Sequence, residues 1–396
     1  MEPHRHEHSP LVIVLAGLAA LASAMGVGRF AFTPLFPLMQ AHDGLSLGQG
    51  AWLASANYLG YFVGALACSV APPEPRKAAR IGLVAVAVFT LAMGLAHGDA
   101  AWLAWRFAAG VASAYVLVGV SAWVLPTLAE RGRAAASGWV FSGVGVGIGA
   151  AGLAGLVAGV GGYEPAPVWL LLGAMSAAVA AITWLPLRAS AIGAPSAGRA
   201  GGPAVREWQL VVCYAAFGFG YIIPATFLPA MARELIHDPA VFGWIWPAFG
   251  ATAAASTVIV ALCLQGAAPR KVWAASLLIM AAGVLAPALL PGVWTLLVAA
   301  VCVGGTFMVA TMAGMQEARR LAGAGAPRLM AAMTAGFALG QLTGPIVVGL
   351  ATVLGSHGIA GASVLGAAFL LASAWALRRP EPAGESPTLL EGRPRT

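Results

Sequence analysis

Long apolar stretches tile almost the whole chain, and they constrain the fold more than any other feature of the sequence. Each runs for roughly 20 residues or more, the length of helix that crosses a hydrocarbon core about 30 Å thick. Only 9% of the 396 residues are charged and 60% are hydrophobic, whereas soluble proteins carry about 25% charged residues. The chain therefore lacks the polar surface of a water-soluble globule, and the sequence predicts an all-α membrane protein.

Twelve such stretches are expected, six on either side of a segment at 188–206 that is rich in Gly, Ala, Pro and Arg. That composition is typical of a mobile linker. The twelve expected spans lie near residues 11–40, 46–70, 78–97, 100–128, 135–160, 167–187, 207–232, 240–265, 272–290, 293–316, 329–354 and 360–377. The expected domains are a tail at 1–10, a six-helix bundle at 11–187, the linker at 188–206, a second bundle at 207–377 and a tail at 378–396.

The basic residues alternate between the two sides of the expected membrane. If the N-terminus is cytoplasmic, all but three of the 21 Lys and Arg residues fall in cytoplasmic segments, the exceptions being Arg29, Arg106 and Arg233. This asymmetry follows the positive-inside rule, so both termini and the linker are expected in the cytoplasm. The net charge of +7 then reports topology, and no single basic face is left to bind nucleic acid.

The two halves contain an internal repeat. A shift of 192 residues aligns GVGRFAFTPLFPLM, which begins at Gly26, with GFGYIIPATFLPAM, which begins at Gly218. The same shift pairs Trp52 with Trp244. Because each half holds an even number of spans, both halves start on the same side of the membrane. The copies are therefore expected to be parallel repeats, with a binding site between them near mid-depth.

These two opening segments resemble those of the YbfB/YjiJ branch of the major facilitator superfamily. The segment RFAAGVASA, which begins at Arg106, also resembles the fourth-helix motif of that superfamily. The resemblance implies the major facilitator fold, built as two parallel six-helix pseudo-repeats. It further implies a monomeric secondary transporter of the bacterial inner membrane, without a cofactor, that moves a small organic solute by alternating access at the interface of the bundles.

Two departures from the wider superfamily bear on function. The loop APPEPRKAAR at 71–80 lacks the usual Gly and Asp, and the fifth span, SGVGVGIGAAGLAG, has the glycines of the antiporter motif without its proline. The missing proline weakens the case for a drug/proton efflux antiporter, which stays open beside an uncoupled facilitator or channel. An enzyme is not expected, because no nucleophile, base or metal cluster converges within the spans. His4, His6 and His8 fit a solvated tail better than a metal site.

Arg29 and Arg106 are the sharpest functional signals, because both fall within spans, in the half of the membrane away from the cytoplasm. A buried arginine costs about 2.5 to 3.5 kcal/mol on insertion scales, so each should face a cavity, a partner or backbone carbonyls. The 14 acidic residues lie in loops, tails or helix ends. One hypothesis is that both guanidinium groups bind an anionic substrate, such as a carboxylate or phosphate. The other is that Arg106 binds backbone carbonyls and Arg29 extends to the membrane interface.

Other polar residues within the spans line a water-filled cavity or bond to a neighbouring helix. Asn57 and Tyr61 are four residues apart and share one helix face, and Tyr221 occupies the repeat position of Arg29. The candidate substrate-binding residues are Arg29, Arg106, Asn57, Tyr61, Tyr115, Tyr221, Thr226 and Gln341.

Glycines in the fifth and eleventh spans recur at the small-xxx-small spacing that lets helix backbones approach closely. We expect them at the interface between the halves, where prolines also provide bends. The candidate packing and gating residues are Gly143, Gly147, Gly340, Gly344 and Pro345.

Coupling is the least defined feature of the sequence. Proton coupling normally needs an Asp, Glu or His embedded in the membrane, and none falls well inside a span. The remaining possibilities for coupling are a proton carried by the substrate, an exchanged counter-anion, or a helix-end acid such as Glu317.

Overall fold

The computed structural model describes residues 9–96, 98–188, 205–235, 243–290, 292–353 and 358–378. Most of the expected linker at 188–206 and of the two expected tails lies outside these ranges. The first half holds α1 (Pro10–Leu21), a π-helical stretch (Ala22–Val27), α2 (Phe32–His42), α3 (Leu47–Val70), α4 (Pro75–Leu95), α5 (Asp99–Glu130), α6 (Ser137–Gly161) and α7 (Pro165–Arg188). The second half holds α8 (Val205–Leu235), α10 (Ile245–Cys263), α11 (Pro269–Leu289), α12 (Val293–Ala322), α13 (Ala326–Val353) and α14 (Gly358–Arg378).

Eleven segments of the described chain are long and apolar enough to cross a membrane. One of them, Val293–Val348, contains both α12 and α13, which meet at the short 3-10 turn Gly323–Gly325. Counting these two helices separately gives the twelve expected spans. The predicted fold class, an all-helical membrane protein, is therefore confirmed.

Local capping explains where two of the helices begin. Pro75 occupies the first turn of α4, where its missing N–H costs nothing, and the Glu74 carboxylate accepts the backbone N–H groups of Arg76 at 2.9 Å and Lys77 at 2.6 Å. At the start of α3, Ser46 and Gln49 cap each other's backbone N–H groups in a capping box. These caps satisfy the terminal donors of helices that must end close to the apolar core of a bilayer.

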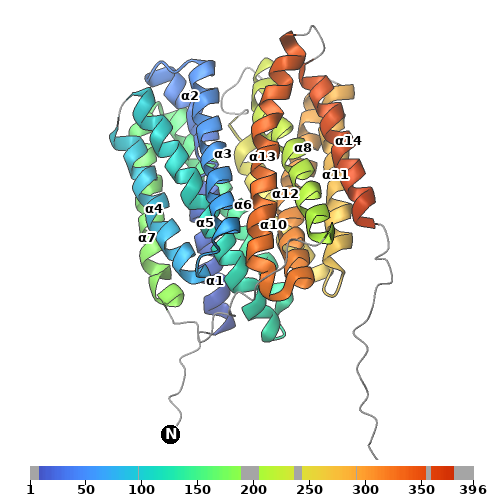
Figure 1. Cartoon of the computed structure of the whole chain (residues 1–396). Helices are drawn as coiled ribbons and strands as arrows, with labels where there is room; N and C mark the ends of the chain where they lie inside the picture. The colour runs from blue at the N-terminus through green and yellow to red at the C-terminus, as the bar shows by residue number, and fades with distance from the viewer. Residues whose placement is uncertain are drawn as a thin grey trace, which may run out of the picture.

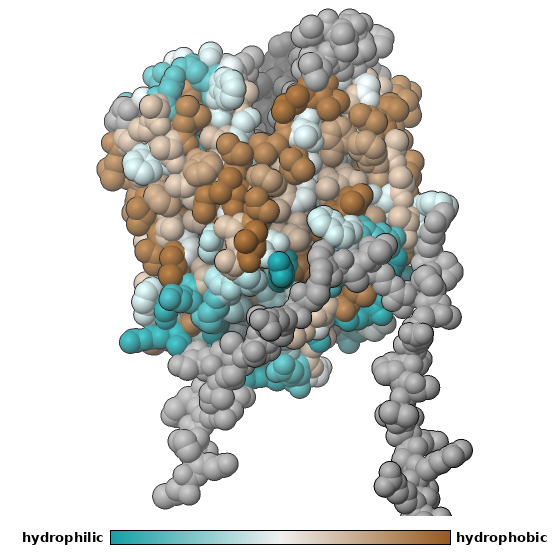
Figure 2. Space-filling view, viewed as in Figure 1, coloured by the Kyte–Doolittle hydropathy of each residue, from teal (hydrophilic) through white to brown (hydrophobic). Residues whose placement is uncertain are grey.

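The helices form two groups that lie side by side (Figure 1). In the first half, α5 packs against α3 and α4, and α4 also packs against α7. In the second half, α8 packs against α13, and α11 packs against α12 and α14. Figure 2 shows hydrophobic residues in a band across the middle of one face, with hydrophilic residues above and below it. This distribution suits a molecule whose belt lies in lipid.

Two helix pairs make most of the contacts between the halves, α6 with α10 and α3 with α13. Along α6 and α10 the backbones themselves touch. A Cβ added at Gly145 would lie 2.3 Å from the backbone nitrogen of Ala254, and one added at Gly250 would lie 2.4 Å from that of Gly149. We call this contact the glycine seam. It needs glycine because any side chain would force the two backbones apart.

The glycines that we expected between the halves lie elsewhere. Gly143 and Gly147 pack against α1 and the π-helical stretch, with added Cβ atoms 2.1 and 2.2 Å from backbone oxygens there, and Gly340 and Gly344 pack against α8. They therefore join helices within one half, because small-residue spacing indicates close approach without specifying the partner helix. Pro345 continues α13, and its side chain lies outside the described part.

Candidate functional site

The first span, Pro10–His42, is interrupted near its middle. Through the π-helical stretch the N–H groups bond five residues back, so that Gly28 donates to the Ser23 carbonyl at 2.9 Å and Phe30 to the Met25 carbonyl at 3.2 Å. A turn over residues 28–31 then leads into α2. Stretches of π-helix are rare and often occur at functional sites. The interruption leaves backbone carbonyls available to side-chain donors.

Close packing from α6 accommodates this interruption. A Cβ added at Gly26 would lie 2.3 Å from the Cα of Gly147, so only glycine fits there. From α5, the Ser113 hydroxyl donates to the Ala24 carbonyl at 2.8 Å. The irregular backbone is thus buried in protein, as a bilayer requires of any non-helical segment.

Arg106 of α5 anchors the freed carbonyls. Its guanidinium, which is 2% exposed, donates to the Gly28 carbonyl at 3.2 Å and to the Arg29 carbonyl at 3.1 Å. The Asn57 amide of α3 donates to the Arg106 carbonyl at 2.9 Å. These are the contacts of the backbone-anchoring hypothesis. Substrate binding by Arg106 and Asn57 stays a prediction, since Nη1 and Nη2 of Arg106 and Nδ2 of Asn57 already donate to backbone carbonyls.

Arg29 has a different environment, because its own guanidinium meets aromatic rings and the opposite half. The side chain is 2% exposed, and its Cζ lies 3.7 Å from the ring centroid of Tyr61 and 5.6 Å from that of Tyr58. One terminal nitrogen, Nη2, donates to the Gln341 side-chain oxygen of α13. Its Nε and Nη1 have no hydrogen-bond partner among the described residues. Arg29 therefore keeps two free donors at the interface of the halves.

The facing wall comes from the second half and is aromatic. Tyr221 of α8 is fully buried, stacked on Phe307 of α12 with ring centroids 5.1 Å apart. Phe30, next to Arg29, meets the same Phe307 ring edge-on at 6.3 Å. Within the described ranges, four polar atoms of this wall and its surroundings are buried without a partner: the Tyr221 hydroxyl, Thr226 Oγ1, Gln341 Nε2 and Asn57 Oδ1. Buried polar atoms are nearly always satisfied by protein, water or a ligand, so these atoms are candidate contacts for a ligand or water.

The structure brings together most of the predicted substrate-binding residues. Arg29, Tyr61 and Gln341 are in direct contact, and Tyr221 joins them through Phe307 and Phe30. Tyr115 does not belong to this cluster, because it packs with Cys68, Val118 and Ala331. Residue-by-residue reading missed Phe30, Tyr58 and Phe307 as site residues. Their aromatic type beside an intramembrane cation is the signal that indicates them.

The site has a net positive character. Glu317 is the one buried acidic residue in the described chain, and both its oxygens bond to Arg320, at 2.9 and 3.0 Å. It lies ten residues beyond Phe307 along α12, a rise of about 15 Å. In the described chain no group of three His, Cys, Asp or Glu side chains is placed to hold a metal ion. The Arg29 cation therefore has aromatic rings and a neutral amide around it instead of a carboxylate.

Comparison with known sequences gives two partial matches. The chain is 30% identical over 126 residues to the "Uncharacterized MFS-type transporter YcaD" of Escherichia fergusonii, over 31% of this chain and 32% of that protein. It is 36% identical over 94 residues to the "Uncharacterized MFS-type transporter YceJ" of Bacillus subtilis, over 23% of this chain and 24% of that protein. These matches span no more than about a third of either relative.

The fold and the family match cover far more of the chain. The crystal structure of the human organic anion transporter MFSD10 (TETRAN) is similar with a TM-score of 0.71 at 14% identity, over 94% of this chain and 100% of that chain. At such an identity the likeness shows the fold alone. The model of the family described as "Uncharacterised MFS-type transporter YbfB" matches residues 21–378. The chain therefore belongs to this family of the major facilitator superfamily and is a multi-pass membrane transporter, not an enzyme.

Proposed function

We propose that this protein is a secondary active transporter that moves a small organic anion by alternating access, with the anion bound at Arg29 between the two halves. The observation that carries the proposal is the buried Arg29 guanidinium, which has two free nitrogens and no carboxylate partner among the described residues. An ionised group in a low-dielectric site is stabilised by an opposite charge. A bound anion supplies that charge.

The free hydrogen-bonding atoms also favour an acceptor-rich ligand. The guanidinium Nε and Nη1 of Arg29 are donors only, and the hydroxyl of Tyr221 can donate as well. Arginine matches the planar geometry of carboxylate and phosphate groups with paired donors. An anionic head with several oxygens would satisfy these atoms together.

The remainder of the site favours an apolar body on that anion. Phe30, Phe307 and Tyr221 form a continuous aromatic surface beside Arg29, and Phe337 stacks on Tyr221 at 5.9 Å. The likeness in fold to a human organic anion transporter is in keeping with this ligand class.

The link between Arg29 and Gln341 supports alternating access. It joins the turn that precedes α2, in the first half, to α13 in the second half. An anion that takes the place of the Gln341 oxygen would release this link and hold Arg29 itself. Ligand binding and the relative motion of the halves are then coupled through one hydrogen bond.

We further assign coupling to anion exchange. A carrier that reorients with its site empty would move the Arg29 charge with only the neutral Gln341 as its partner. A carrier loaded with an anion moves a neutral pair, which is less costly to shield from lipid. Counterflow of two anions should therefore exceed net uptake.

Counterflow in proteoliposomes tests the proposal. Vesicles preloaded with one of a panel of small carboxylates, sulfonates and phosphate monoesters receive the same labelled compound outside, and neutral amides serve as matched controls. At least one anion should accumulate transiently while its amide does not. Arg29→Gln should lower this counterflow at least a hundredfold, and Arg29→Lys should retain part of it. Equal counterflow by Arg29→Gln and the unchanged protein would refute the proposal.

The proposed location is the bacterial inner membrane with both termini and the linker in the cytoplasm, as the distribution of basic residues favours. Two introduced cysteines test this topology. Ser196→Cys lies in the linker, and Tyr163→Cys lies on the loop after α6. Tyr163 is 59% exposed. In intact cells a membrane-impermeant maleimide should label only Tyr163→Cys. Labelling of Ser196→Cys alone would invert the topology.

A further inference from the structure

A pocket lies between the halves, well away from Arg29. It has a volume of about 470 Å³ and is bordered by the end of α5 and the following turn in the first half, and by α10, α11 and α12 in the second. Met312, the lining residue of α12 nearest to Phe307, is five residues beyond it, a rise of roughly 8 Å. Arg319 is twelve residues beyond Phe307, about 18 Å along the helix. The pocket is therefore separate from the Arg29 site.

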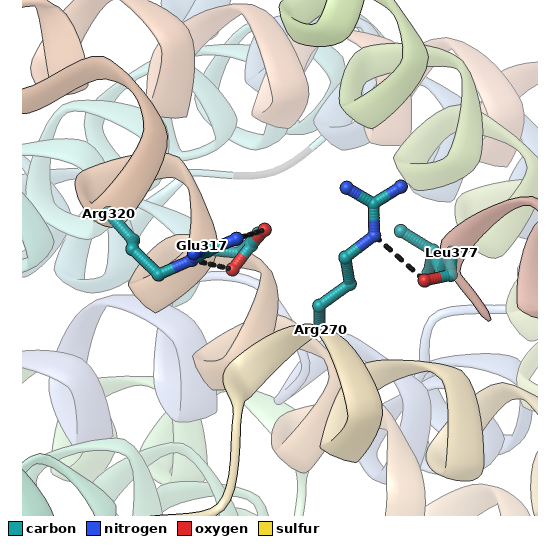
Figure 3. A network of polar contacts seen from close by, with 4 residues as sticks. All are labelled: Arg270, Glu317, Arg320 and Leu377. Atoms are coloured by element: carbon teal, nitrogen blue, oxygen red, sulfur yellow. Dashed lines mark hydrogen bonds and ion pairs between the residues drawn. The ribbon is translucent and has the colours of Figure 1, made fainter. Parts of the chain in front are cut away.

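The charge of this pocket is positive and unevenly compensated. Two arginines, Arg319 and Arg320, line it, and no Asp or Glu stands among its described lining residues. Arg320 is held by both oxygens of the buried Glu317, and the neighbouring Arg270 donates to the Leu377 carbonyl at the end of α14 (Figure 3). Arg319 makes no hydrogen bond or ion pair with any other described residue, and its side chain is half-buried. It is thus the uncompensated cation of the pocket.

The rest of the lining is mostly apolar, with polar amides beside the arginines. Leu125 from the first half and Val260, Leu264 and Met312 from the second supply the apolar surface. Gln316, another lining residue, donates from Nε2 to the Ser137 hydroxyl of α6 at 2.8 Å, across the boundary between the halves. A ligand in this pocket would therefore lie directly against a contact that holds the halves together.

We propose that this pocket is a second binding site, which takes an amphipathic organic anion with its carboxylate or phosphate on Arg319 and its apolar body against Leu264 and Met312. Cation and apolar surface lie side by side, which is the complement of such a molecule. The same chemistry belongs to a dissolved organic anion and to the headgroup of an anionic phospholipid. The proposal does not depend on the role of Arg29.

The experiment measures thermal unfolding of the full chain in nanodiscs, through its 13 tryptophans. All variants are made in the Arg29→Gln background, so that any binding at the central site is removed. In one arm, cyclohexanecarboxylate is titrated into nanodiscs of phosphatidylcholine, with cyclohexanecarboxamide as the neutral control. In the other arm, phosphatidylglycerol replaces a rising fraction of the phosphatidylcholine and no soluble anion is added.

Three variants separate the site from general charge effects. Arg319→Gln removes the proposed contact, Arg319→Lys keeps the charge, and Arg328→Gln removes an exposed arginine that does not line the pocket. We expect stabilisation in at least one arm, with an apparent affinity that falls at least tenfold in Arg319→Gln, partly recovers in Arg319→Lys and is unchanged in Arg328→Gln. The arm that responds identifies a soluble anion or a lipid headgroup.

Two outcomes overturn the proposal. One is the absence of stabilisation in both arms. The other is an equal response of Arg319→Gln and Arg328→Gln, which would make Arg319 one more cytoplasmic charge that sets orientation. Loss of counterflow in the Arg29→Gln variant alone, with the Arg319 response intact, would support the central site and this one separately.

Discussion

The two spans that open the halves carry the repeated segment, yet they differ where the candidate site lies. The first is interrupted by the π-helical stretch at Ala22–Val27, whereas α8 runs without a break from Val205 to Leu235. At the repeat positions, Arg29 corresponds to Tyr221, and Arg106 corresponds to Val298, which is 46% exposed on the outside of its half. The interruption and the arginine that anchors it occur together in one half, and both are missing from the other.

This difference shows how a symmetric scaffold can hold an asymmetric site. A broken backbone inside a membrane needs donors for its carbonyls, and Arg106 supplies two of them. In the second half α8 is unbroken, so its backbone carbonyls at the equivalent positions need no side-chain donor. The exposed Val298 can therefore stand at the position that corresponds to Arg106. The first half then offers charge, and the second offers aromatic surface and single hydroxyls.

The largest effect expected from this comparison is on stability. Arg106→Leu leaves the Gly28 and Arg29 carbonyls buried without donors, which should cost about 2 to 6 kcal/mol of the free energy of unfolding. Val298→Ala, at the repeat position, should cost less than about 0.5 kcal/mol because the side chain is exposed. Thermal unfolding in nanodiscs compares the two. Similar losses for both variants would mean that the interruption does not depend on Arg106.

Glycine substitutions test where the halves remain alike. An added Cβ would lie 2.3 Å from the Cα of Gly147 at Gly26 and 2.2 Å from the Phe337 carbonyl oxygen at its repeat partner, Gly218. Gly26→Ala and Gly218→Ala should therefore both destabilise the protein, by about 1 to 3 kcal/mol each, because overpacking forces the backbones apart. The same unfolding measurement applies. A loss confined to one variant would show that the helix contacts are not equivalent.

A change in the link between the halves should strengthen binding. In Gln341→Leu the Arg29 guanidinium loses its competing acceptor, and a hydrogen bond to a charged group contributes about 1.5 to 3 kcal/mol. The apparent affinity for a transported anion should rise about tenfold, read from the half-saturation of counterflow. Weaker binding would instead make Gln341 a ligand of the anion, and the proposed competition would be rejected.

The smallest expected effect concerns the buried Tyr221 hydroxyl of the second half. Tyr221→Phe removes a buried hydroxyl with no partner in the described chain, so the protein should unfold at the same or a higher temperature. If the hydroxyl bonds the anion, affinity should fall about two- to tenfold, the size of one neutral hydrogen bond. A stability loss without an affinity change would place the hydroxyl in packing only.

Much of the architecture follows from short-range patterns. The length of the apolar stretches predicts the spans, since a helix must match the thickness of the bilayer. The 192-residue repeat indicates that Arg29 and Tyr221 occupy equivalent positions in their halves. An arginine within a predicted span can also be recognised as a site candidate from the sequence alone, because burying its charge in a membrane is costly and is rare without a functional role.

The remaining features depend on contacts between residues far apart in sequence. The partner of Arg29, Gln341, lies 312 residues away, and nothing in the local sequence pairs them. The interruption in the first span rests on the fit of Gly26 against Gly147 and on the donors of Arg106. The helices that Gly143 and Gly340 pack against could likewise not be predicted from the small-xxx-small spacing. That spacing indicates a close helix contact but does not say which neighbouring helix makes it.

The glycine seam between α6 and α10 bears on how the halves move. Where Gly145 and Gly250 bring bare backbones together, the closest contacts among the described residues are made by backbone atoms. In the alternating access that we propose, the halves would pivot at this contact, where a tilt of about 4° changes the local distances little but moves points about 30 Å away along the helices by roughly 2 Å. A bulky residue introduced in the glycine seam is therefore expected to block this proposed motion without contacting the proposed substrate site.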